Sequence, residues 1–229
     1  MDLPSPAIAR NRPPSPTSTM SSATELQPTA MRVIRIADAP KTPWRNGGGT
    51  TRELLAWPSA DDWWLRLSVA EIARDGPFSA YPEVDRLLAV LSGSGVRLRW
   101  PDGREVVLTP ASAPLAFDGA DPPEAHLLDG GTTQDLNLML RHGRLTGCLV
   151  RALPGVAWPS VAPLRGVLSL GAVRLHRQGH ATADLPACSL AFESRDPAAL
   201  QALDWQLDGP AEAIAFWIAA VPWVPGTSP

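Results

Sequence analysis

Residues 63–72 read WWLRLSVAEI, and this stretch decides the fold class. Leu65, Leu67 and Val69 occupy one set of alternate positions, while Arg66 and Ser68 occupy the other. A period of two is typical of a β-strand whose two faces meet different surroundings. The same alternation recurs in residues 96–100 (VRLRW) and 135–142 (DLNLMLRH), and Gly-, Pro- and Asp-rich turns separate the runs. The pattern predicts an all-β sandwich or barrel, with a hairpin turn at 100–105.

The composition excludes several classes of partner. The net charge of −3 gives no electrostatic footprint for nucleic acid or for an anionic membrane. The longest apolar run, residues 211–224, contains Glu212 and Pro222 and is shorter than the roughly 18 to 20 residues of a membrane span. We therefore expect a cytoplasmic protein without nucleic-acid or membrane partners. Cys148 and Cys188 show no metal-binding spacing, and two unpaired thiols are favoured over a disulfide.

The chain divides into three segments. Residues 1–30 are rich in Pro and Ser and poor in large apolar residues, so we expect a disordered leader, with Met31 as a possible true start. Residues 31–145 hold the main motifs and form the expected N-terminal lobe. Residues 146–229 repeat the strand pattern less sharply and form the expected C-terminal lobe. Short helices are expected only at 38–40 and 196–200.

The best-marked motif is WRNGGGTTRE, residues 44–53. Three consecutive glycines permit close approach of the backbone to a ligand or to a neighbouring strand. The motif is not a P-loop, because no Gly-Lys-Ser/Thr follows, and no strand–helix context supports a dinucleotide fingerprint. Two interpretations stay open: a simple glycine-rich turn, or the rim of a pocket formed by Asn46 and the amides of Gly47 and Gly48. Strand alternation places Thr51 and Glu53 on one face and Arg52 on the other.

The segment 78–95, FSAYPEVDRLLAVLSGSG, has the spacing of the first cupin motif without its metal ligands. The positions of the ligands fall on Ser79, Tyr81, Arg86 and, in the second motif, Leu115. A guanidinium repels a divalent cation, and an alkyl chain offers no lone pair. The four histidines (His126, His142, His176 and His180) are scattered. We therefore expect no metal and no other cofactor.

Polar residues follow one face of several strands, namely Arg66 with Ser68, Arg86, and Asp135 with Asn137. On an open sheet this face would meet water. Inside a closed barrel these groups must pair or bind a ligand. Arg66 or Arg86 could form a buried pair with Asp135, and a spare arginine would suit a carboxylate ligand.

Together the ordered motifs PWRNGGGTTREL, WLRLSVAEIARDGPFS, YPEVDRLLAVLSGSG, PLAFDGAD and QDLNLMLRHG resemble the HutD/Ves family. The resemblance covers residues 31–145 strongly and the remainder in strand pattern only. It implies a double-lobed cupin-type barrel (a bicupin, or RmlC-like jelly roll) and an association with bacterial histidine utilisation. Arg45 departs from the family, in which Lys is frequent at this position. The family's motif positions correspond to Trp44, Asn46, Gly47, Gly48, Thr51, Arg52, Glu53, Arg66, Ser68, Phe78, Asp85, Arg86, Asp118, Asp135 and Asn137, and Tyr81 joins them as a candidate site residue.

Three functions remain open. The first is a metal-free binding protein for a small carboxylate, such as a formylglutamate- or urocanate-like acid, that regulates histidine degradation or a stress response. The second is a metal-independent enzyme, an isomerase or hydrolase, with Glu53, Asp85 or Asp135 beside Tyr81 as acid and base. The third is an interaction scaffold whose polar faces are solvated. A homodimer is possible.

Overall fold

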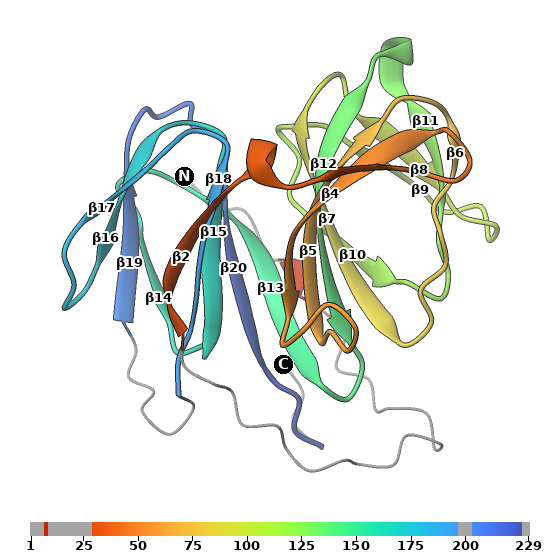
Figure 1. The fold of residues 1–229 in the computed structure, drawn as a ribbon. Helices are drawn as coiled ribbons and strands as arrows, with labels where there is room; N and C mark the ends of the chain where they lie inside the picture. The colour runs from red at the N-terminus through yellow and green to blue at the C-terminus, as the bar shows by residue number, and fades with distance from the viewer. Residues whose placement is uncertain (1–6, 9–28, 197–202, 226–229) are drawn as a thin grey trace.

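We describe residues 7–8, 29–196 and 203–225 of a computed structural model of the chain. These residues form strands, turns and two single-turn 3-10 helices, η1 (Ile36–Asp38) and η2 (Leu128–Gly130). Every strand pairing in these ranges is antiparallel, and the strands form four sheets. No helix in this part of the chain is long and apolar enough to cross a membrane. The all-β prediction is confirmed, and Figure 1 shows the strands gathered into two lobes that lie side by side.

One lobe, called the N lobe, consists of two sheets (Figure 1). Its large sheet has the strand order β10 (Leu115–Asp118), β7 (Val84–Ser92), β12 (Thr133–Arg141), β5 (Leu65–Ile72), β4 (Gly49–Trp57) and β3 (Lys41–Pro43). Its small sheet has the order β6 (Gly76–Pro77), β11 (Glu124–Leu127), β8 (Val96–Arg99) and β9 (Glu105–Leu108). The hairpin expected at residues 100–105 joins β8 to β9.

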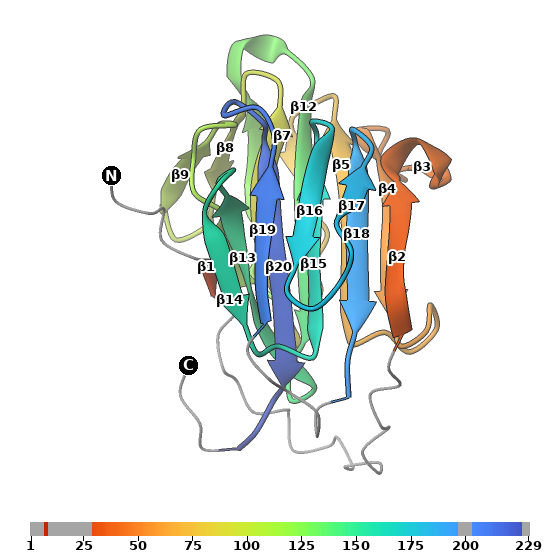
Figure 2. The same ribbon diagram turned by 90° about the vertical axis from the view of Figure 1, so that its left-hand side faces the viewer.

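The second lobe, called the C lobe, has the same composition of one six-stranded and one four-stranded sheet. In Figure 2 the longer strands of this lobe run nearly vertically. The large sheet has the order β1 (Ala7–Ile8), β13 (Leu145–Ala152), β20 (Ala215–Pro222), β15 (Leu164–Ser169), β18 (Ser189–Ser194) and β2 (Thr29–Arg35). The small sheet has the order β14 (Ala157–Ser160), β19 (Leu203–Asp208), β16 (Val173–Arg177) and β17 (Ala183–Leu185).

Three apolar cores hold these sheets together. The largest core lies between the two large sheets and joins, for example, Leu67 and Leu138 of the N lobe to Leu168 and Ile218 of the C lobe. The second core lies inside the N lobe, around Leu88 and Phe117. The third lies inside the C lobe. The large sheets therefore bury both faces, one against the other lobe and one inside their own lobe.

This arrangement explains the alternation seen in residues 63–72. Leu65 and Leu67 are fully buried against the C lobe, whereas Arg66 and Ser68 point into the N lobe. The apolar face therefore makes the contact between the lobes, and the polar face lines the interior of its own lobe. Among the described residues the four sheets remain separate, and no closed barrel is found.

The expected boundary of the leader and the N lobe differs from the structure at two places. The first long strand, β2, begins at Thr29 and pairs with β18 of the C lobe, not with the N lobe. Ala7 and Ile8, within the expected disordered leader, pair with β13. Because strand pairing is decided by distant partners, local composition does not reveal it. The remaining leader residues, 1–6 and 9–28, lie outside the described residues.

Two smaller predictions concern the short helices and the two cysteines. The expected turn of helix at 38–40 forms two residues earlier, as η1. Most of the helix expected at 196–200 lies outside the described residues. Cys148 and Cys188 are free thiols, as expected.

Candidate functional site

A cavity of about 810 Å³ lies in the N lobe, against the polar face of its large sheet. It is lined by eleven of fifteen candidate residues, namely the family's motif positions other than Asp118, together with Tyr81. They are Trp44, Asn46, Thr51, Glu53, Arg66, Ser68, Phe78, Tyr81, Arg86, Asp135 and Asn137. Eight further residues complete the lining: Pro40, Thr42, Pro43, Arg45, Ala70, Pro77, Ser79 and Met139.

The strand registers arrange the cavity wall in layers. In the first layer Thr51 of β4 and Asp135 of β12 lie on either side of Ala70 of β5. In the second layer Ser68 of β5 separates Glu53 from Asn137. In the third layer Met139 of β12 separates Arg66 from Arg86. Side chains two residues apart on a strand share a face, so the alternation predicted which residues of each strand face the cavity, but not which strands lie side by side.

Arg86 is the most deeply placed cation of the cavity, with 4% of its surface exposed. Its guanidinium carbon lies 5.0 Å from the ring centroid of Phe78, 5.1 Å from that of Phe117 and 5.7 Å from that of Tyr81. Aromatic faces attract a cation electrostatically and so compensate part of its lost hydration. Burial lowers the pKa of Arg86 to about 10, against the opposing charge of Asp135, so the group remains a cation at neutral pH.

The guanidinium of Arg86 is only partly used by the protein. Its Nε donates to Oδ1 of Asn137 at 3.5 Å, and its Nη1 donates to the carbonyl oxygen of Ser79 at 3.3 Å. In the described part of the chain these are its side-chain hydrogen bonds. Since a guanidinium has five N–H groups, three remain available to a ligand.

Asp135 is the buried acid of the cavity, with 1% of its surface exposed. Its Oδ1 atom has no hydrogen-bond partner among the described residues. Burial raises the pKa of Asp135 to about 7, although the nearby charge of Arg86 lowers it. The carboxyl therefore changes its protonation state in the physiological pH range.

Arg66 forms its ion pair with Glu53, a partner that was not expected from the sequence. Its Nε donates to Oε2 of Glu53 at 2.6 Å, and its Nη1 donates to the Tyr81 hydroxyl at 3.4 Å. Burial lowers the pKa of Arg66, but these two hydrogen bonds outweigh it and the net pKa is raised. The expected ion pair of an arginine with Asp135 is thus not formed by Arg66, and Arg86 acts on Asp135 through its charge without a hydrogen bond. Glu53 neutralises Arg66, which leaves Arg86 as the better anion receptor.

The glycine-rich motif forms part of the rim. The indole Nε1 of Trp44 donates to Oγ1 of Thr51 at 2.8 Å, and the amide of Gly48 donates to Oδ1 of Asn46 at 3.0 Å. A Cβ on Gly49 would lie 2.2 Å from the carbonyl oxygen of Glu71, so only glycine fits at this position. Asn46 lines the cavity together with Trp44 and Thr51, so the motif contributes to the rim, whereas the amides of Gly47 and Gly48 do not line it.

Four candidates do not line the cavity. Gly47 and Gly48 shape the turn, with Gly47 at φ 68°, but neither contributes to the lining. Arg52 lies on the opposite face of β4, as the alternation predicts, and donates to the carbonyl oxygens of Ala37 and Ala39. Asp85 is also buried on the other face of its strand, with Oδ1 3.3 Å from Nε2 of His142.

Two further residues from the motif comparison also lie outside the lining. Asp118 lies beside Asp85 in the pairing of β10 with β7. Leu115 is half-buried against the apolar core of the N lobe. Both are therefore placed by strand packing and not by the cavity.

Three lining residues that precede the motif, and Arg45 within it, were not predicted from the sequence. Pro40, Thr42, Pro43 and Arg45 line the cavity, because β3 pairs with β4 and continues directly into the rim. The signal that could have revealed them is the short extended segment before Trp44, which faces the strand carrying Thr51.

The cupin metal positions do not fit a metal ion in this chain. Tyr81 and the buried cation Arg86 stand at two of them, and Ser79 uses its carbonyl oxygen to accept from Arg86. A buried guanidinium would repel a divalent cation. Among the described residues no group of three or more His, Cys, Asp or Glu side chains could hold a metal ion.

The fold and the cavity define an all-β, cupin-like protein. A structure of a mutant oxalate decarboxylase from Bacillus subtilis has this fold with a TM-score of 0.52 at 10% identity, over 91% of this chain and 82% of the other. HutD from Pseudomonas fluorescens SBW25 aligns with a TM-score of 0.71 at 24% identity, over 84% of this chain and 99% of the other.

The particular family follows from the sequence. The family model described as HutD matches residues 36–209, and the chain belongs to this family. A conserved protein of unknown function from Pseudomonas aeruginosa PAO1 is 27% identical, with a TM-score of 0.72 over 84% of this chain and 99% of the other. Protein Ves of Cronobacter sakazakii is 36% identical over 114 residues, 50% of this chain and 62% of the relative. The matched segment thus spans about three fifths of the curated relatives, and the resemblance stated from the motifs is confirmed.

Proposed function

We propose that the chain is a metal-free binding protein of the cytoplasm that holds a small carboxylate in the cavity of its N lobe. One observation carries the proposal: Arg86 is a buried cation in the cavity lining, and three of its N–H groups have no hydrogen-bond partner among the described residues. A carboxylate accepts two parallel hydrogen bonds from a guanidinium, so it would supply both the missing charge and the missing acceptors.

The size and chemistry of the cavity support a small ligand. A volume of about 810 Å³ lies in the range of small-molecule sites. Arg86 is 4% exposed and packed among aromatic rings, and such low exposure to water strengthens an ionic hydrogen bond. We further propose that each pair of sheets is a cupin-type jelly roll, the two together forming a bicupin.

The family suggests which acid this is. One relative, 36% identical over 111 residues, is an uncharacterised protein of Pseudomonas putida encoded in the hutC 3′ region. We propose a histidine-degradation intermediate of the formylglutamate or urocanate type, bound by a protein that regulates that pathway or a stress response.

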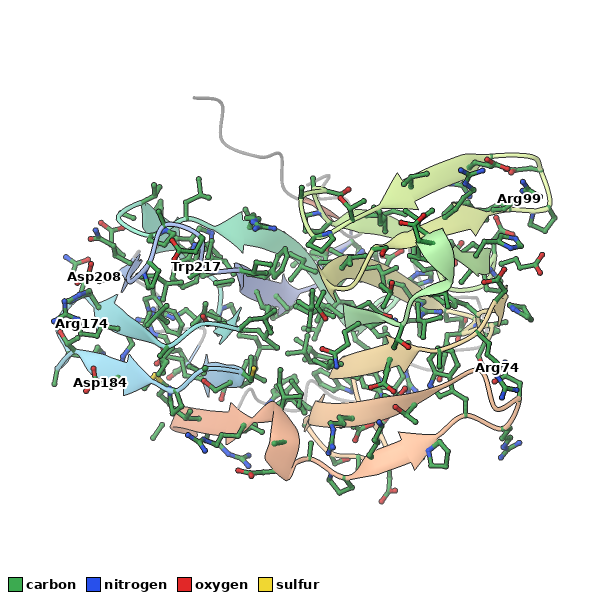
Figure 3. The ribbon with its side chains drawn as sticks, turned by 90° about the horizontal axis from the view of Figure 1, so that it is seen from above. Arg74, Arg99, Arg174, Asp184, Asp208 and Trp217 are labelled. Atoms are coloured by element: carbon green, nitrogen blue, oxygen red, sulfur yellow. The ribbon has the colours of Figure 1, made fainter. Side chains whose placement is uncertain are left out.

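The test is calorimetric titration of the protein with formylglutamate, urocanate, glutamate and succinate. We expect at least one acid to bind and Arg86→Gln to lose about 1.5–3 kcal/mol, roughly tenfold or more in affinity. The control is Arg99→Gln, because Arg99 lies at the outer edge of the N lobe (Figure 3) and pairs with Glu105. If no acid binds, or if both variants bind as the wild type does, the proposal is wrong.

The enzyme alternative has one observation in its favour. Asp135 has a pKa of about 7 and lies in the cavity beside the proposed anion receptor, as a general acid or base would. If the protein is an isomerase or hydrolase of the same acid, Asp135→Asn abolishes turnover while the acid still binds. A search for turnover of urocanate and formylglutamate by the wild type separates the two functions.

A further inference from the structure

The cavity contains an acceptor as well as a cation. Asp135 belongs to the cavity lining, and its buried Oδ1 atom has no hydrogen-bond partner among the described residues. A buried acceptor without a donor costs about 1–3 kcal/mol, and more when it is charged. A ligand that brings an N–H group to this atom removes that cost.

The layers of the cavity place this acceptor apart from the anion receptor. Asp135 lies in the layer of Ala70, and Arg86 lies two layers away, beside Met139. Between them Asn137 already accepts from Arg86 Nε. The small side chain of Ala70 leaves the space next to Asp135 to a ligand. One end of the cavity therefore donates hydrogen bonds, and the other end accepts them.

We propose that the ligand is a small acid that also carries an N–H donor, such as an N-acylamino acid or an imidazole-containing acid, and that Asp135 selects it through this N–H group. The proposal rests on the proposed function, because it requires the carboxylate to lie on Arg86. It adds that Asp135 determines specificity. A site built to bind an N–H group discriminates strongly against an analogue without it, since the acceptor is then left unpaired.

The test uses two pairs of acids that differ only in the atom facing Asp135. N-acetylglutamate is compared with 2-acetoxyglutarate, and N-acetylglycine with acetoxyacetate; in each pair an ester oxygen replaces the N–H. We expect the wild type at pH 8 to bind at least one N–H acid about tenfold more tightly than its ester. Asp135→Asn has nearly the same shape and offers a donor as well as an acceptor, so the ratio falls towards one. Asp208→Asn, the same substitution at the exposed outer edge of the C lobe, is the control and leaves the ratio unchanged.

A second measurement on the wild type keeps the test independent of how the variant folds. The amide-to-ester ratio is measured at pH 6 and at pH 8. The ionised carboxylate of Asp135 only accepts, whereas the protonated form also donates to an ester, so the ratio increases with pH. Arg45, Glu53, Arg66, Tyr81 and Arg86 share the cavity and act on both members of a pair alike, so the ratio isolates Asp135.

The outcomes separate the two proposals. If acids bind and depend on Arg86, but amide and ester bind equally at pH 8, the selection by Asp135 is wrong and the proposed function stands. The same holds if the tenfold ratio persists in Asp135→Asn. If no acid in the panel binds, both proposals fail.

Discussion

At the residue scale, two buried groups of opposite charge sit in one cavity without a hydrogen bond between them. Arg86 is surrounded by Phe78, Tyr81 and Phe117, and Asp135 keeps an unpaired oxygen among the described residues. A pair formed only for stability would be expected to bond directly, because burying either charge is costly. Unused hydrogen-bonding capacity on both groups is typical of a binding site, where function is maintained at the expense of stability.

The first prediction concerns Asp135 and pH. Burial raises the pKa of Asp135 to about 7 from 3.8, so between these values the folded state binds a proton that the unfolded chain has lost. Stability therefore falls as pH rises through this window, by up to about 4 kcal/mol for this group alone. Asp135→Asn removes this dependence on pH. The free energy of unfolding of the variant therefore increases relative to that of the wild type between pH 5 and pH 8.

Urea unfolding of both proteins at pH 5, 6, 7 and 8 measures this gain. We expect the difference in unfolding free energy, variant minus wild type, to become more positive at each step. A difference that stays constant across the series would mean that the carboxyl of Asp135 is ionised throughout.

The residues of the site could be predicted only in part. The cupin spacing and the alternation identified Arg86, Asp135 and Asn137, because side-chain direction in a strand follows a fixed period. The sequence left open whether Arg66 or Arg86 would pair with Asp135, and it did not identify Glu53 as the partner of Arg66. The pairing depends on which strand lies beside β5, and β4 brings Glu53 there. The local sequence does not show which strand lies beside β5.

At the element scale, the rim depends on the close approach of β4 to β5. A Cβ on Gly49 would meet the carbonyl oxygen of Glu71 at 2.2 Å and the ring of Trp44 at 3.1 Å. We predict that Gly49→Ala displaces Trp44, costs about 1–3 kcal/mol of stability and weakens acid binding. Gly47→Ala is the matched control: it has φ 68° and open space around it, so it costs about 1 kcal/mol and leaves the rim in place. Equal losses in stability and affinity for the two variants would contradict this account.

The C lobe contains a directly hydrogen-bonded counterpart to the open charge pair of the N lobe. Glu193 of β18 accepts from Nε and Nη2 of Arg165 at 2.8 and 2.6 Å, and from Nη1 of Arg177 at 3.2 Å. Arg165 is fully buried, and its guanidinium carbon lies 4.6 Å from the ring centroid of Trp205. In this lobe the carboxylate of Glu193 accepts hydrogen bonds from the guanidinium groups of both Arg165 and Arg177.

We predict that Glu193→Gln lowers the free energy of unfolding by roughly 3–5 kcal/mol, because the buried Arg165 and the partly buried Arg177 lose their counter-charge. The control is Asp208→Asn. Asp208 pairs with Arg174 at the exposed outer edge of the C lobe (Figure 3), where an ion pair contributes about 0–1 kcal/mol. Denaturant unfolding measures both. A loss at Glu193 no larger than that at Asp208 would show that the pair contributes little.

At the scale of the whole molecule, the two lobes share their largest apolar core. The alternation predicted strands and an apolar face, but not that this face would pack against a second lobe. Nor did composition reveal that β2 crosses to the C lobe, since such pairing is decided by tertiary contacts. Neither lobe can bury this face alone.

We therefore predict that the lobes unfold together. Leu138 is fully buried in the shared core, and Leu138→Ala costs about 2–5 kcal/mol. Native-state hydrogen exchange should show an equal loss of protection in β12 of the N lobe and β15 of the C lobe. Loss confined to β12, or two separate unfolding transitions, would contradict a shared core.

The most direct test of the central claim is a crystal structure of the protein with the tightest-binding acid of the titration panel. We predict that the carboxylate of the acid lies in the N-lobe cavity, with its oxygens about 2.7–3.2 Å from the guanidinium nitrogens of Arg86. An acid bound at another place, or in the cavity with its carboxylate turned away from Arg86, would contradict the account.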